Sequence, residues 1–120
     1  MRMVEVVVVE DAPLQQMLIQ ELIRHDHSIV GVAGDGDEAI DLVEQRDPDV
    51  VIMDLNLPDG NGTIATRWLK FVTPDLPVII LTSMVNKTIQ KELNEHGVEE
   101  YLVKPVSKEE ILEAIETVTQ

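Results

Sequence analysis

Short aliphatic runs recur along this chain, and they constrain its fold more than any other feature. Four of them cover Val6 to Val9, Val50 to Met53, Val78 to Leu81 and Tyr101 to Val103, and a weaker one covers Ser28 to Ala33. Buried parallel strands have this composition, because helices cover both of their faces. The runs therefore predict the strands of a parallel sheet.

Apolar residues at helical spacing follow each predicted strand. We expect a first helix with Pro13 in its first turn and a second helix that begins at a cap on Asp35 or Asp37. Two more helices cover Ile64 to Phe71 and Asn86 to Glu95, and the last one starts near Ser107. The turn-forming residues from Pro58 to Gly62 predict a loop, and Gly97 is expected to end a helix in the left-handed conformation. Five strands alternating with five helices predict a parallel sheet covered on both faces, in one domain over residues 1–120.

The composition excludes several classes of function. The chain has 23 acidic and 9 basic residues and a net charge of -14, which argues against direct binding to nucleic acid. It has no cysteine for a disulfide or a thiolate site, and no apolar stretch long enough to span a membrane. No secretory leader is recognised, so we expect a cytoplasmic protein whose partners present basic or apolar surfaces.

Polar residues that suit phosphoryl chemistry stand at the ends of four predicted strands. They are Glu10 and Asp11 after the first, Asp54 after the third, Thr82 and Ser83 after the fourth, and Lys104 after the fifth. The carboxyl ends of parallel strands share one edge, which is where open α/β sheets place their sites. We therefore expect three carboxylates, two hydroxyls and one ammonium group to meet in one crevice.

Asp54 is the candidate reactive group, because a carboxylate at a strand end can attack phosphorus and carry the group as an acyl phosphate. The like charges of Glu10 and Asp11 beside it would be costly without a divalent cation. Oxygen ligands of this kind suit Mg²⁺, with Mn²⁺ as an alternative, and the backbone carbonyl of Asn56 is a further candidate ligand. Lys104 would supply the positive charge opposite the metal.

The hydroxyl of Thr82 and the backbone amide of Ser83 are expected to bind two phosphoryl oxygens. Taken singly, these site residues also suit structural roles. Asp11 and Asp54 would cap helices or turns, Thr82 or Ser83 would cap the fourth helix, and Lys104 would be a solvated turn residue. If each had only a structural role, several independent coincidences would be needed to place them all at strand ends. We therefore favour the functional interpretation.

The same residues resemble the receiver domain of bacterial two-component response regulators, from end to end of the chain. The matching positions are the acidic metal-binding pair Glu10-Asp11, the phosphorylated aspartate Asp54, the switch hydroxyl Thr82, the switch aromatic Tyr101, and Lys104-Pro105. Glu10 replaces an aspartate of the usual pair, a variant that the family tolerates.

This resemblance implies a flavodoxin-like, doubly wound α/β fold with five parallel strands in the order 2-1-3-4-5 and five helices. It implies a signalling switch that is not a turnover enzyme, in which Asp54 takes a phosphoryl group from a sensor histidine kinase or a phosphotransfer protein with Mg²⁺. The domain would catalyse its own phosphorylation and dephosphorylation. Thr82 and Tyr101 would then alter the surface of helix four, strand five and helix five toward an output domain or downstream protein. A cis peptide bond before Pro105 is also implied.

Three other interpretations compete with this one. A haloacid-dehalogenase-like phosphatase also needs an aspartate, a hydroxyl and a lysine at strand ends, but Asn56 stands where such enzymes need a second aspartate. A flavodoxin-like FMN binder would hold phosphate in its first loop, where Glu10 and Asp11 repel it. A degenerate receiver acting only as a docking scaffold would have lost a site residue, and none is lost.

Overall fold

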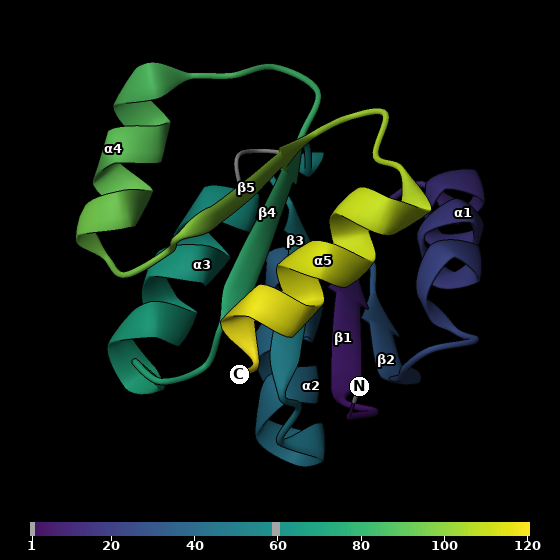
Figure 1. Ribbon diagram of the computed structural model, residues 1–120. Helices are drawn as coiled ribbons and strands as arrows, with labels where there is room; N and C mark the ends of the chain where they lie inside the picture. Colours follow the sequence, from purple (N-terminus) through teal and green to yellow (C-terminus); the bar gives the residue numbers. More distant parts are fainter. Residues whose placement is uncertain (1, 59–60) are drawn as a thin grey trace.

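The computed structural model describes residues 2–58 and 61–120 of the chain. Strands and helices alternate along these residues (Figure 1). In chain order they are β1 (Glu5–Val9), α1 (Pro13–Ile23), β2 (Ser28–Ala33), α2 (Gly36–Arg46), β3 (Val50–Asp54), α3 (Asn61–Val72), β4 (Val78–Thr82), α4 (Lys87–Glu95), β5 (Glu100–Val103) and α5 (Lys108–Val118). The alternation predicted from the aliphatic runs is confirmed.

The strands form one parallel sheet in the order β2-β1-β3-β4-β5, as the family resemblance implies. The register pairs Val9 at the end of β1 with Met53 in β3, and Asp54 at the end of β3 with Leu81 in β4. The carboxyl ends of the three central strands therefore lie at the same edge of the sheet. None of the helices in the described part of the chain has the length and hydropathy of a membrane span.

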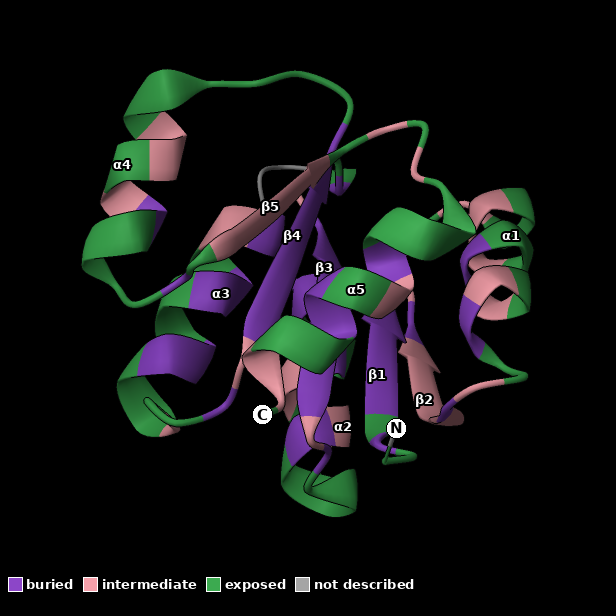
Figure 2. Cartoon of the chain, in the orientation of Figure 1, coloured by how far each residue is buried: buried purple, intermediate pink, exposed green. Residues whose placement is uncertain are grey.

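Helices cover both faces of the sheet, with α1 and α5 on one face and α2, α3 and α4 on the other (Figure 1). Side chains of a strand point alternately to the two faces. Accordingly, Val6 and Val8 pack with α1 and α5, while Val7 and Val9 pack with the helices opposite. Figure 2 shows the buried central strands β1, β3 and β4 between helices that are exposed on their outer sides.

Most of the predicted helix ends are confirmed. Asp35, not Asp37, caps α2, and its Oδ1 accepts a hydrogen bond of 2.8 Å from the Glu38 amide. Ser107 caps α5 in a reciprocal capping box with Glu110. Gly97 follows α4 with φ of 99°, a conformation that glycine adopts without strain.

The predicted loop from Pro58 to Gly62 is wrong in its last two residues, because α3 begins at Asn61. Asp59 and Gly60 lie outside the described residues. The first turn of α3 packs closely on the end of β3, where a Cβ atom on Gly62 would lie 2.6 Å from the Asp54 carbonyl oxygen. Only glycine lets the first turn of α3 approach the end of β3 this closely.

Candidate functional site

Three carboxylates meet at the carboxyl edge of the sheet. Glu10 follows β1 and Asp54 ends β3, and each is only 1% exposed, whereas Asp11 is exposed. One oxygen from each of the three lies within 4.8 Å of the other two. Neighbouring parallel strands bring the two buried carboxylates together, because β1 pairs directly with β3. The clustering of these three residues agrees with the expectation from the strand ends.

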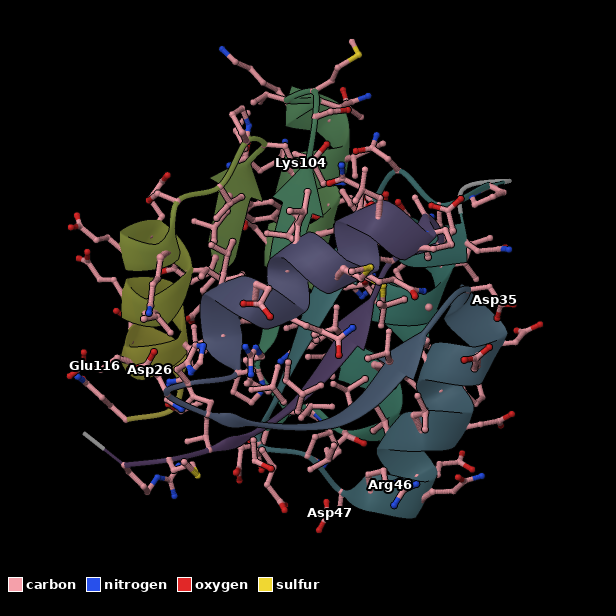
Figure 3. The ribbon with its side chains drawn as sticks, turned by 90° about the vertical axis from the view of Figure 1, so that its right-hand side faces the viewer. Asp26, Asp35, Arg46, Asp47, Lys104 and Glu116 are labelled. Atoms are coloured by element: carbon pink, nitrogen blue, oxygen red, sulfur yellow. The ribbon has the colours of Figure 1, made fainter. Side chains whose placement is uncertain are left out.

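Lys104 reaches the same carboxylates from the loop after β5. Its Nζ donates hydrogen bonds of 2.7 Å to Asp54 Oδ2 and 3.1 Å to Glu10 Oε1. Figure 3 shows Lys104 at the end of the sheet opposite Asp47. Burial lowers the pKa of the ammonium group, but the hydrogen bonds to Asp54 and Glu10 outweigh it and raise the pKa. A solvated turn is therefore the wrong interpretation of Lys104, whose bond to Pro105 is cis.

The carboxyl group of Glu10 has a raised pKa. Burial first and the adjacent Asp54 carboxyl group second raise its pKa, and the net value is about 7. The Ala12 amide, which donates to Oε2 at 3.1 Å, and the Lys104 ammonium group act in the opposite direction. Glu10 therefore takes up a proton just below neutral pH. A divalent cation would compete with that proton for the same oxygens.

Main-chain groups fix the orientation of the Asp54 carboxylate. The Asn56 amide donates to Asp54 Oδ1 at 2.8 Å. The side-chain carbonyl of Asn56 in turn accepts hydrogen bonds from the Ser83 amide at 2.8 Å and the Ser83 hydroxyl at 3.1 Å. This link between the ends of β3 and β4 was not predicted from the sequence, because it depends on the spacing of two loops.

The hydroxyls of the two predicted switch residues, Thr82 and Tyr101, form hydrogen bonds with main-chain groups. Thr82 Oγ1 donates to the Met84 carbonyl at 2.7 Å and accepts from the Met84 amide at 3.2 Å. The Tyr101 hydroxyl donates to the Gln90 carbonyl at 3.1 Å, and burial raises its pKa to about 12. Thr82 and Tyr101 line one cavity of about 480 Å³ between α4 and β5. Of the two hydroxyls expected beside the carboxylates, that of Thr82 is bonded to Met84 and that of Ser83 to Asn56 Oδ1.

Helix capping does not explain the hydroxyl residues that end β4. The helix cap of α4 is Asn86, whose Oδ1 accepts hydrogen bonds of 3.1 Å from the amides of Thr88 and Ile89. The alternative in which Thr82 or Ser83 caps this helix is therefore wrong.

The donor set is suited to a hard divalent cation. Glu10, Asp11 and Asp54 offer only oxygen atoms, and Asp11 lies on the exposed side, where water can complete the coordination. Magnesium prefers this combination of few carboxylates and several waters. The residues present therefore fit Mg²⁺.

The fold and the site together define a doubly wound α/β domain with an acidic pocket and a lysine at the carboxyl edge of its sheet. The response regulator receiver domain matches residues 6–116, and the chain belongs to this family. Members of the family are signalling domains of two-component systems and bind Mg²⁺ at an acidic pocket.

Relatives and solved structures agree with this assignment. The chain is 36% identical over 117 residues to Protein CcdB of Bacillus subtilis, covering 97% of this chain and 98% of CcdB. It is 36% identical over 114 residues to the transcriptional regulatory protein PdtaR of Mycobacterium tuberculosis, covering 92% of this chain but only 54% of PdtaR. A LuxR-family two-component response regulator from Aurantimonas sp. SI85-9A1 superimposes with a TM-score of 0.90 at 28% identity, covering 98% and 86% of the two chains.

Proposed function

We propose that this chain is a phosphorylation switch in which Asp54 accepts the phosphoryl group. The observation that carries the proposal is the position of the Asp54 carboxylate, which is buried, ends β3, and lies beside the Lys104 ammonium group and two further carboxylates. A carboxylate oxygen of Asp54 attacks phosphorus, the bond from phosphorus to the donor group breaks, and the donor leaves with the bonding electrons. The product is an acyl phosphate.

Glu10, Asp11 and Asp54 would hold the Mg²⁺ ion, together with the main-chain carbonyl of Asn56. When bound, the metal neutralises charge on the phosphoryl oxygens. Lys104 supplies the second positive charge from the side of β5. Because its Nζ already contacts Asp54, the ammonium group can follow the charge from the carboxylate to the phosphoryl group with a small movement.

The switch consists of an exchange of hydrogen bonds. To bind the phosphoryl group, the Thr82 hydroxyl exchanges its bonds to Met84, and the Ser83 amide exchanges its bond to Asn56 Oδ1. Tyr101, which shares a cavity with Thr82, then gives up its bond to Gln90 and changes the surface formed by α4, β5 and α5. A local charge change thereby biases a two-state element.

The donors that fit this chemistry are a phosphohistidine on a sensor kinase or on a phosphotransfer protein, and the readers are an output domain or a downstream protein. Such partners imply a cytoplasmic location. The chain spans about half the length of PdtaR, so the activity of a whole regulator is part of this proposal and not a finding. We further propose that the group is stored and slowly removed by the domain itself, in contrast to the repeated turnover of a phosphatase.

The test is incubation with acetyl phosphate and Mg²⁺, followed by intact-mass measurement. The protein should gain the mass of one phosphoryl group, and hydroxylamine should remove it. Asp54→Ala and a sample containing EDTA should gain nothing. An unmodified wild-type protein would reject the proposal, and so would an adduct of equal yield on the Asp54→Ala variant.

A further inference from the structure

The outer face of α3 exposes a stripe of large apolar side chains. Ile64, Trp68, Phe71 and Val72 are 57%, 51%, 79% and 52% exposed. Residues four and seven or eight apart lie on the same side of a helix, so these four form one continuous surface. We call them the α3 stripe. They play no part in the site at the edge of the sheet.

The inner side of α3 also carries apolar side chains, next to the buried Thr66 and Lys70. Ala65 and Leu69 on the inner face are buried against the sheet, while Arg67 is the charged residue of the outer face. A helix that is apolar on both sides is typical of one covered by a further layer of protein. The chain has only one Trp and one Phe, and both are in the stripe. Large aromatic residues are enriched where interfaces have their energetic centres.

The distribution of charge indicates what covers the stripe. The chain carries 23 acidic residues, yet α3 has none. Two copies of so acidic a protein repel one another wherever their carboxylates meet. On α3 there are no carboxylates to cause this repulsion. A strongly basic partner would meet the cation of Arg67 on the outer face of α3 and no carboxylate of that helix. A second copy of this chain is the occupant that the charges favour.

The charges on the two sides of the α3 stripe are also complementary to one another. On the face of the sheet that they share, α3 lies between α2 and α4 (Figure 1), and Arg67 is on the α4 side, where its Nε lies 3.2 Å from Glu92 Oε1. A two-fold axis parallel to α3 would place α2 of each copy over the Arg67 side of the other. The exposed carboxylates of α2 are Asp37, Glu38, Asp41 and Glu44.

The exposed area sets the strength of the contact. The exposed parts of Trp68 and Phe71 supply on the order of 250 Å² per copy, judged from the area that aromatic side chains bury. A stable interface buries roughly 800 Å² per partner, so the stripe needs the contribution of α2 as well. We propose that the α3 stripe is the interface of a parallel two-fold homodimer that forms and dissociates with protein concentration. The interface does not require phosphorylation of Asp54.

Trp68, the only tryptophan of the chain, makes the test specific to this face. Sedimentation velocity and acrylamide quenching of the tryptophan fluorescence are measured together on the unphosphorylated protein, from micromolar to millimolar concentration. As concentration rises, the mass should double and Trp68 should become shielded from acrylamide. Phe71→Glu should weaken dimerisation by more than about tenfold, because it places two charges in an apolar interface.

Leu14→Glu is the matched control, since Leu14 is 65% exposed on α1 and far from the stripe. This variant should dimerise like the wild type, and the thermal melting of both variants should stay unchanged. A wild-type protein that remains a monomer throughout the range would overturn the inference. So would a dimer in which acrylamide reaches Trp68 as freely as in the monomer, because the stripe would then lie outside the interface.

Discussion

The Nζ atom of Lys104 lies 2.7 Å from Oδ2 of Asp54, which joins the loop after β5 to the end of β3. The same ammonium group lies 3.1 Å from Glu10 Oε1, so one cation serves two buried carboxylates. Buried carboxylates require such compensation, because burial disfavours their charged form. The ion pair therefore offsets part of the cost of burying these two carboxylates side by side.

Removing the ammonium group should separate metal binding from switching. In Lys104→Ala the three carboxylates remain, and Mg²⁺ affinity should stay within about tenfold of wild type or become tighter, because no ligand is lost and a competing cation is gone. Beryllofluoride, which mimics a phosphoryl group, should no longer change the α4, β5 and α5 surface. Calorimetry measures the Mg²⁺ affinity, and amide chemical shifts measure the change in the α4, β5 and α5 surface. Equal responses of both proteins to beryllofluoride would contradict the role of Lys104.

Magnesium affinity should depend on pH through Glu10. The pKa of this carboxyl is raised to about 7, so the proton-free form that binds metal is lost as the pH falls through that value. Below about pH 7 the affinity should drop by up to tenfold per pH unit, as expected for displacement of one proton. Glu10→Gln should bind more weakly and show a flatter dependence. An affinity of the wild type that stays constant between about pH 5 and 8 would contradict this.

Gly62→Ala should disturb both the fold and the site. The new Cβ would lie 2.6 Å from the Asp54 carbonyl oxygen and 3.1 Å from Leu55 Cα, so backbone must move. We expect a loss of about 1–3 kcal/mol in the free energy of unfolding, as for other overpacked positions, with slower phosphorylation. Urea unfolding measures the loss. Gly34→Ala is the control, because nothing lies within 4 Å of its added Cβ; equal stability of the two variants would refute the steric argument.

The buried His27 should make the protein less stable in mild acid. It is 2% exposed, its Nδ1 accepts a hydrogen bond from the Val4 amide at 3.2 Å, and burial lowers its pKa. The unfolded chain therefore binds the proton first, and stability is lost as the pH falls below the unfolded value of about 6.5. Between about pH 7 and 5, His27→Gln should lose less stability than wild type. Stability is measured by unfolding at each pH, and an equal loss of stability with falling pH in the two proteins would exclude this role of His27.

The sequence predicts the sheet and its polar edge well, for a simple reason. Strand composition depends on burial, and residues directly after parallel strands must meet at one edge. The meeting of Glu10, Asp11, Asp54 and Lys104 follows from that rule. The rule does not give the hydrogen bonds of Thr82 and Tyr101, whose hydroxyls donate to the main-chain carbonyl of Met84 in the loop after β4 and to that of Gln90 in α4.

Apolar spacing predicts helices but not the side that the sheet covers. In α1, Leu14, Met17 and Leu18 have helical spacing, yet the structure exposes them and buries Ile19 and Ile23. The α3 stripe is not apparent in the sequence for the same reason, because α3 has apolar residues on both its buried and its exposed side. The raised pKa of Glu10 likewise depends on burial between strands far apart in the chain.

The central claim, that Asp54 carries the phosphoryl group, is tested most directly by locating the modified residue. Borohydride reduces an acyl phosphate to an alcohol, so treatment after incubation with acetyl phosphate and Mg²⁺ should convert the modified aspartate to homoserine. Proteolysis and tandem mass spectrometry then read the position. We predict homoserine at position 54 and at no other residue. Reduction at another carboxylate, or none in a protein that has gained phosphoryl mass, would contradict the claim.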